Sequence, residues 1–112
     1  MQKTAHPGDE PRVPALSDRQ RRYLRGLAHA LKPVIRVGGA GLTPGILAET
    51  ARALGDHELV KVKAAAGDRE ARDELFRTLA QLTASALVQR IGNVAVLYRP
   101  REELPRILIP DA

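Results

Sequence analysis

Residues 34–45 read VIRVGGAGLTPG and join a short, mostly β-branched run to a glycine-rich turn and the start of a helix. The run at 34–37 has the composition of a strand, and the glycines within 38–41 let the backbone adopt φ > 0 and approach a ligand closely. Thr43 is a favoured N-cap, and Pro44 suits the first helical position, which needs no N–H. This order of strand, glycine loop and helix N-terminus aims free N–H groups and the positive end of a helix dipole at one point. The stretch therefore predicts a loop that binds an anion, most often a phosphate.

The composition of the chain limits its class. With 112 residues, 44% of them hydrophobic, the chain is long enough for one small domain with one core. It has no cysteine, which excludes disulfides and thiolate metal sites, and its two Tyr and one Phe exclude extensive aromatic stacking on bases. No apolar run approaches the roughly 20 residues of a membrane span, and the N-terminus lacks a signal-peptide core. We expect a cytoplasmic protein that does not enter a membrane.

The charge of the chain is concentrated in one segment. Lys and Arg number 18 against 13 Asp and Glu, which gives a net charge of +5. Between residues 17 and 41 the single acidic residue is Asp18, and the segment alone accounts for the whole net charge. Its basic residues are Arg19, Arg21, Arg22, Arg25, Lys32 and Arg36. Such concentration favours a polyanionic partner over the alternative that the charge serves solubility.

Periodicity and turn signals predict three helices and four strands. The helices are expected to begin at the N-caps Ser17, Thr43 and Asp68, and Ser17 forms a capping-box pair with Gln20. Strands are expected at 34–37, 58–63, 86–91 and 94–98, and Gly92-Asn93 between the last two is a strong hairpin signal. Gly55 is expected to end the second helix. The predicted buried stripe of the first helix is Gln20, Tyr23, Leu24, Leu27 and Leu31.

These elements predict a single α/β domain of order αβαβαββ. A strand, helix and strand imply one parallel pair, and the hairpin adds an antiparallel pair. We therefore expect a two-layer domain in which helices pack against a four-stranded mixed sheet, with the GxxG loop between the first strand and the second helix. The domain should span 16–100. Residues 1–15 should form a disordered arm, and residues 101–112 a tail without regular structure.

Two basic surfaces accompany the loop. In the strand at 58–63, alternation places Lys61 and Lys63 on the face opposite Val60 and Val62. For these lysines a solvated strand face is the competing interpretation. On the first helix the basic residues lie opposite the apolar face and have no acidic neighbour at i+3 or i+4. They are Arg22, Arg25, His29 and Lys32.

Nucleotide-binding motifs are incomplete in this chain. The glycines at 39, 41 and 45 come close to a dinucleotide fingerprint, but Pro44 removes an N–H from the first helical turn. Lys61 and Lys63 also stand where NAD-binding folds place a carboxylate. No Lys-Ser/Thr pair follows the glycines, as a Walker loop requires.

Side chains for metal or acid–base chemistry are scattered. His6, His29 and His57 have no partner at i+4, so we predict no metal site, no cofactor and no catalytic residue. Asp56-His57-Glu58 could supply acid–base groups, but three consecutive residues point in different directions. We interpret the triplet as a solvated turn.

Four blocks of sequence occur in a distinctive order: SxxQxxxLxxLAHxLKPV at 17–34, VGxxGLTxG at 37–45, HELVKVK at 57–63 and QxIGxxxVLYRP at 89–100. Together they resemble the CRM domain in its stand-alone bacterial form, the YhbY-like RNA-binding proteins. The resemblance implies an αβαβαββ fold similar to the C-terminal domain of a bacterial translation initiation factor. It also implies a role with precursors of the large ribosomal subunit. The GxxG loop resembles that of KH domains, which clamps a nucleic-acid backbone.

The predicted function is RNA binding without catalysis, with ribosomal RNA in large-subunit precursors as the partner. Family members often place Lys, Ser or Asn inside the loop, so Gly39 and Ala40 shift the contact to backbone N–H groups and flanking cations. A protein-interaction module that docks on an acidic partner and a small nucleotide-binding enzyme remain alternatives. The predicted RNA-binding residues are Gly38, Gly39, Ala40, Gly41, Arg22, Arg25, His29, Lys32, Arg36, Lys61 and Lys63.

Overall fold

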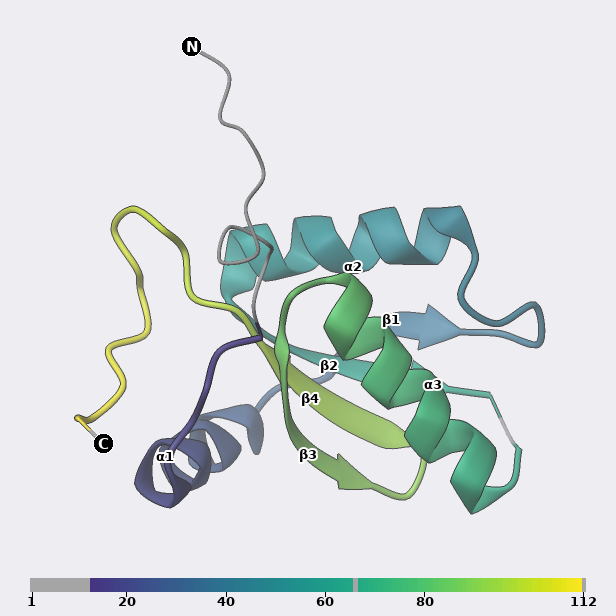
Figure 1. Ribbon diagram of the computed structural model, residues 1–112, viewed down its shortest axis with the longest axis horizontal. Helices are drawn as coiled ribbons and strands as arrows, with labels where there is room; N and C mark the ends of the chain where they lie inside the picture. The colour runs from purple at the N-terminus through teal and green to yellow at the C-terminus, as the bar shows by residue number, and fades with distance from the viewer. Residues whose placement is uncertain (1–12, 66, 112) are drawn as a thin grey trace, which may run out of the picture.

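The order of elements confirms the predicted αβαβαββ fold (Figure 1). The structure is a computed structural model that describes residues 13–65 and 67–111, so most of the predicted arm at 1–15 lies outside the described residues. The sheet has the strand order β1-β2-β4-β3, with β1 parallel to β2 and the other neighbours antiparallel. The elements are α1 (Asp18–Ala28), β1 (Pro33–Val37), α2 (Pro44–His57), β2 (Leu59–Ala64), α3 (Arg69–Leu82), β3 (Ala86–Ile91) and β4 (Val94–Tyr98).

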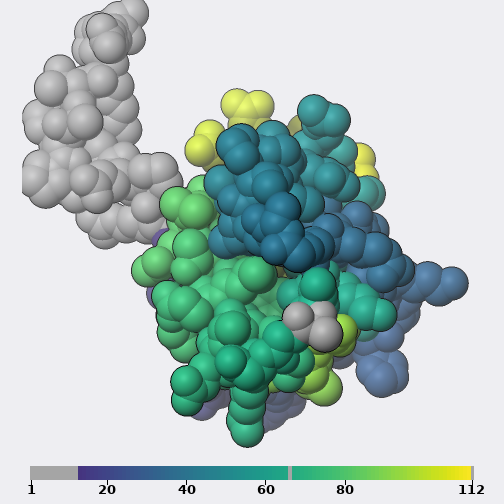
Figure 2. Space-filling model, turned by 90° about the vertical axis from the view of Figure 1, so that its right-hand side faces the viewer, coloured from purple at the N-terminus to yellow at the C-terminus, as the bar shows by residue number. Residues whose placement is uncertain are grey.

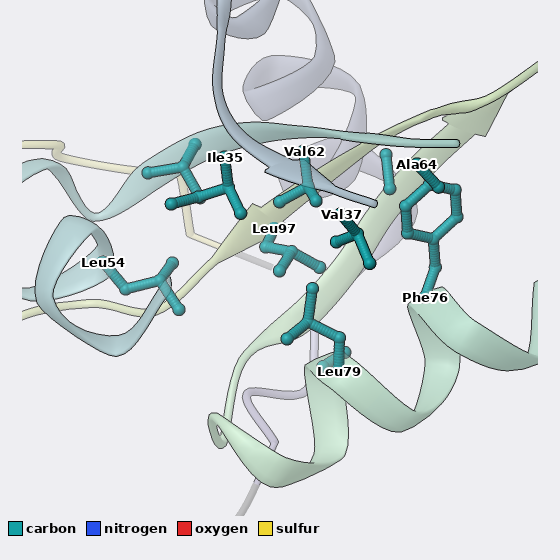
Figure 3. Close-up of a cluster of buried hydrophobic side chains, with 11 residues drawn as sticks. Ile35, Val37, Leu54, Val62, Ala64, Phe76, Leu79 and Leu97 are labelled. Carbon is teal, nitrogen blue, oxygen red and sulfur yellow. The ribbon is translucent and has the colours of Figure 1, made fainter. Parts of the chain in front are cut away.

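Helices cover both faces of the sheet, so the predicted two-layer arrangement is wrong and the domain has three layers. On one face, Leu54 of α2 and Phe76 and Leu79 of α3 pack on alternate residues of β1, β2 and β4 (Figure 3). On the opposite face, α1 packs through Leu24 and Ala28 on the start of β2 and on β3 and β4. Side chains alternate between the two faces of a strand, and β4 carries apolar residues at successive positions. Both of its faces must therefore be covered.

The local signals at the helix starts are confirmed. Ser17 Oγ accepts a hydrogen bond from the Gln20 N–H at 3.1 Å, and Gln20 Oε1 accepts one from the Ser17 N–H at 3.0 Å. Thr43 Oγ1 accepts from the Ile46 N–H at 3.2 Å and so caps α2. The Asp68 carboxylate caps α3 in the same way. Each cap satisfies an N–H that the helix itself leaves free.

The C-terminal end of α2 differs from the prediction. Gly55 lies inside the helix, which continues to His57. A Cβ on Gly55 would lie 3.9 Å from Nη2 of Arg99, and that guanidinium donates to the carbonyl oxygens of Ala51 and Thr83, each at 2.9 Å. That distance is an ordinary van der Waals contact, so Arg99 does not require glycine at this position. The helix ends at Glu58, which has φ +64°.

The stripe that α1 buries is narrower than predicted. Leu24 is buried, as expected, and is joined by Ala28. Tyr23, Leu27 and Leu31 remain 43%, 39% and 38% exposed. The sheet thus covers only the centre of the predicted apolar face and leaves one flank of α1 open.

Glu58 is fully buried, which contradicts its interpretation as part of a solvated turn. Its carboxylate accepts three backbone hydrogen bonds, from Arg101 at 2.9 Å, Arg106 at 2.7 Å and Ile107 at 2.9 Å. Burial alone would raise the pKa of Glu58, but these N–H donors and the positive charge of Arg101 outweigh it and hold the pKa below its usual value. The carboxylate is therefore ionised and anchors the segment that follows β4.

This anchoring makes residues 101–111 part of the packing, although they contain no helix or strand. Ile107 and Ile109 pack against the cluster beneath α1. Gln20 of α1 also donates to the carbonyl oxygen of Pro110 at 2.9 Å. The tail thus connects Glu58, at the end of α2, to the opposite face of the sheet.

Replacing Glu58 by Gln should lower the free energy of unfolding by about 2–4 kcal/mol at neutral pH, because an amide cannot accept all three N–H bonds as a carboxylate does. A carboxyl whose pKa is lowered by folding stabilises the folded state above its unfolded pKa, and this contribution is lost as pH falls through the folded pKa. The difference between the two proteins should therefore shrink below about pH 4.3. Urea titrations at a series of pH values measure this difference in the free energy of unfolding.

Glu49→Gln is the matched control, since Glu49 lies in α2, the helix that Glu58 ends, and is exposed. Its unfolding free energy should stay within about 0.5 kcal/mol of the unmodified chain. Equal stability of the Glu58→Gln and Glu49→Gln variants at neutral pH would contradict the anchoring role.

Candidate nucleic-acid interface

The predicted GxxG loop is a tight turn with an exposed backbone. The Gly38 carbonyl oxygen accepts a hydrogen bond from the Gly41 N–H at 3.0 Å, and Gly41 has φ +74°, which favours glycine. Gly39 and Ala40 at the tip are exposed, and no atom lies within 4 Å of the place where a Cβ on Gly39 would stand. Within the described residues, the N–H groups of Gly39 and Ala40 donate to no protein acceptor. The turn therefore presents two free donors to solvent.

The start of α2 adds little to these donors. The Thr43 N–H donates to the Gly41 carbonyl oxygen at 3.0 Å, and Pro44 has no N–H. Ile46 is capped by the Thr43 hydroxyl, and the Leu47 N–H already bonds the Thr43 carbonyl oxygen. In the first turn only the N–H of Gly45 has no acceptor among residues 13–65 and 67–111. The predicted anion donors therefore lie mainly in the turn and not in the helix end.

Figure 2 looks onto the end of the molecule that lies on the right in Figure 1, where α2 lies above α3.

A basic strip runs along the sheet from the turn. We use this name for Arg36 of β1 with Lys61 and Lys63 of β2. Ile35 and Val37 are buried against α2 and α3, so Arg36 points to the opposite face, and Lys61 and Lys63 point there with it. Arg36 and Lys63 are direct neighbours in the β1–β2 register. Like charges opposite each other destabilise a sheet, so this pair favours an anionic ligand.

The strip stays open because of where α1 sits. β1 is an edge strand, and α1 packs mainly on β2, β3 and β4. Arg36 and Lys63 are therefore exposed, and Lys61 is half-buried. The sheet face that carries α1 is apolar beneath the helix and basic beyond it.

Four predicted residues come from α1 and the link to β1. Arg22, Arg25, His29 and Lys32 are all exposed. About 100° separates successive residues of a helix, so Arg25 lies on one flank of the buried Leu24 and Leu27 on the other. Leu27 faces the start of β2 and Ile107 of the tail. The basic flank of α1, which carries Arg25, therefore lies on the side away from Leu27, where Arg21 contacts β3.

The candidate residues of α1 and those of the turn do not meet at one point. The five residues of β1 separate Lys32 from the turn, a span of about 16 Å at about 3.3 Å per residue. This span is longer than a single phosphate group, so one phosphate cannot contact both Lys32 and the turn. The arrangement is suited to a polymer with repeated negative charges, and the assignment of each residue to RNA remains a prediction.

Arg21 has a structural contact that sequence reasoning missed. Its Nη1 donates to the carbonyl oxygens of Leu87 at 2.7 Å and Val88 at 3.1 Å, where the β3–β4 register shifts. The bond ties the start of α1 to β3. In sequence Arg21 was one of several basic residues, and only a contact 66 residues away in the chain distinguishes it.

Two further features are absent from the part of the chain that the structure describes. Among residues 13–65 and 67–111, no group of three His, Asp or Glu side chains is placed to hold a metal ion. In the same ranges no helix has the length and apolar character needed to cross a membrane.

Comparisons with known proteins agree with the fold. The CRS1/YhbY (CRM) domain matches residues 16–99. A Haemophilus influenzae protein named as an RNA-binding protein is 50% identical over 95 residues, which cover 81% of this chain and 96% of that protein. A Pseudomonas aeruginosa protein named as a probable RNA-binding protein is 47% identical over 85 residues, with 76% and 82% covered. The solution structure of a hypothetical Staphylococcus aureus protein has a TM-score of 0.75 and 35% identity, and the match covers 86% of this chain and 100% of that one.

Arg21 and Arg22 form a matched pair for a test. Arg21→Ala should lower the free energy of unfolding by about 1–2 kcal/mol, because it removes charged hydrogen bonds to two carbonyl groups. Arg22→Ala removes the same charge from an exposed position and should change the free energy of unfolding by less than about 0.5 kcal/mol. Denaturant titrations measure both. Equal losses would mean that Arg22 also makes a structural contact.

Proposed function

The chain belongs to the CRS1/YhbY (CRM) domain family, and on that premise we propose that it binds RNA by gripping a single-stranded backbone. The turn at 38–41 supplies backbone donors for a phosphate. The basic strip and the basic flank of α1 hold the phosphates that follow. The names of the relatives support RNA as the class of ligand.

The observation that carries the proposal is the lack of internal partners for these cations. Between described residues, ion pairs join Arg77 to Glu74 and Arg90 to Asp73, and both involve α3. No such pair involves the basic strip or the exposed arginines of α1. α3 thus mixes signs, as a solvated surface does, whereas the strip and α1 present one sign to an outside partner.

The turn contributes geometry more than charge. Gly39 and Ala40 carry no bulky side chain, so a phosphate oxygen can approach the two free N–H groups closely. These contacts fix the position of the backbone without reading the base, because backbone contacts carry no sequence information. The neighbouring Arg36 and Lys63 then provide long-range attraction.

The RNA that fits the family resemblance is ribosomal RNA within precursors of the large subunit. We propose that the protein acts there, in the cytoplasm, as a binding protein and not as an enzyme. An acidic protein partner would use the same cations, but it has no need of the exposed donors in the turn.

RNA affinity should fall steeply with salt. If four to six phosphates are neutralised, the slope of log affinity against log salt should be about −3 to −4, from about −0.7 for each contact with a single strand. Changing Arg36 and Lys63 together to Gln should make the slope shallower by about 1.4. Fluorescence anisotropy with a single-stranded RNA at several salt concentrations measures both values.

The matched control changes two exposed arginines outside the site, Arg52→Gln with Arg77→Gln, and removes the same charge. Its slope should equal that of the unmodified chain. Equal changes in the two double variants would mean that net charge, and not the basic strip, determines binding.

Replacing Gly39 and Ala40 by Asp should abolish binding. Two negative charges would stand where a phosphate binds, and like charges across an interface cost several kcal/mol, so affinity should fall more than about a hundredfold. The fold should persist, because both positions are exposed and acidic groups near a helix start are favourable by about 0.3–1 kcal/mol. Anisotropy and thermal unfolding measure the two effects.

Gly39→Asn with Ala40→Asn has nearly the same shape without the charge and should lose much less affinity. A folded Asp variant that binds RNA as tightly as the unmodified chain would remove the turn from the mechanism.

A further inference from the structure

A groove of about 470 Å³ opens beside the C-terminal end of α1, on the side away from the basic flank. Its volume lies within the range of about 300–1,000 Å³ of small-ligand sites. Three basic side chains line it, Lys32, His57 and Lys61, and no acidic one does. The apolar lining consists of Leu27, Leu31, Val34, Leu59, Val60 and Ile107.

The floor of the groove exposes more apolar surface than the fold requires. Leu27 and Leu31 remain 39% and 38% exposed, and Val34 is 52% exposed. They come from the end of α1, the link that follows it and the edge strand β1, and they lie together around one hollow. Clustered exposed aliphatic side chains mark a binding surface more often than single ones do.

The charges around the groove indicate its ligand. Lys32 and Lys61 lie with His57 among the apolar side chains, so a ligand with apolar faces and a negative charge beside them is complementary. Lys61 also belongs to the basic strip, so the groove and the strip are continuous. A nucleotide has this combination, with a flat base attached to a phosphate-bearing backbone.

We propose that the groove takes one unstacked base of a bound RNA strand, while Lys32 and Lys61 hold the adjacent phosphates. This proposal rests on the proposed function and specifies the RNA ligand as a single strand with one unstacked base. Base edges carry hydrogen-bonding groups, and the imidazole of His57 in the lining can form a hydrogen bond with them. With two Tyr and one Phe in the chain, an aliphatic floor takes the role that aromatic rings have in other single-strand sites.

A protein ligand fits this groove less well. A helical peptide docks through several anchors spaced along a groove, whereas the hollow here is compact and its lining carries one basic residue for every two apolar ones. A duplex also fits poorly, since its bases are stacked and paired. The groove thus favours a single strand.

The test compares two probes with equal charge, a single-stranded oligouridylate and an abasic ribose-phosphate strand of the same length. The unmodified chain should bind the oligouridylate about five- to tenfold more tightly, because only that strand has a base to place in the groove. Leu27→Ala with Leu31→Ala should abolish this preference. The salt slope should not change, since no cation is removed.

The control variant, Leu82→Ala with Ile91→Ala, truncates two aliphatic side chains that are 61% and 68% exposed elsewhere. It should keep the preference. Methyl NMR gives a second readout in the unmodified chain, where oligouridylate should shift the signals of Leu27, Leu31 and Val34 and the abasic strand should not. This readout does not depend on the folding of a variant.

The outcomes separate the two proposals. Binding of both strands with equal affinity, or a preference that survives in the Leu27/Leu31 variant, would overturn the base site and leave RNA binding intact. Failure to bind either strand would overturn the proposed function, and the base site with it. An acidic peptide that shifts the same methyl signals while oligouridylate does not would assign the groove to a protein.

Discussion

Glu58, whose carboxylate is buried, holds together α2, β2, the end of β4 and the C-terminal tail. Its backbone ends α2 at a positive φ and accepts a hydrogen bond from the Arg99 N–H at 2.8 Å, so α2, β2 and the end of β4 meet there. Its side chain accepts three N–H bonds from the tail. A buried charge is tolerated only when it is paired or hydrogen-bonded, so the tail must adopt one conformation around it. That conformation places Ile107 against the α1 cluster and beside the groove.

The open binding surface follows from the position of β1. Because β1 is the edge strand and α1 packs mainly on the other three strands, one face of β1 and part of β2 remain uncovered. The residues on this uncovered face are Val34, Arg36, Lys61 and Lys63, three of which are cations. On an uncovered face such side chains remain hydrated, whereas beneath a helix they would have to be desolvated. The same offset of α1 leaves Leu27 and Leu31 without a partner. The basic strip and the apolar groove thus have a common origin in the placement of one helix.

Predictions from the sequence succeeded where neighbouring residues decide the outcome and failed where distant ones do. The capping box at Ser17, the cap at Thr43 and the Gly92-Asn93 hairpin each depend on a few adjacent residues, and all were correct. Gly55 has the sequence of a helix stop, but α2 continues to His57 and ends at Glu58, whose carbonyl oxygen bonds the N–H of Arg99, far along the chain. Glu58 in a polar triplet looked solvated because its partners, Arg101, Arg106 and Ile107, lie more than 40 residues away.

The sequence by itself determined the order of the elements, the turn at 38–41 and the identity of the cations, because periodicity, caps and charge are properties of local sequence. It also placed Lys61 and Lys63 on the face opposite Val60 and Val62, since strand alternation has a fixed period. Only the tertiary structure decided that α1 covers the second face, that Arg21 is structural while Arg22 is exposed, and that an apolar groove opens beside Lys32 and Lys61. These features depend on which helix packs on which strands. That choice depends on the total apolar surface buried and on hydrogen bonds between distant segments, which no short window of sequence contains.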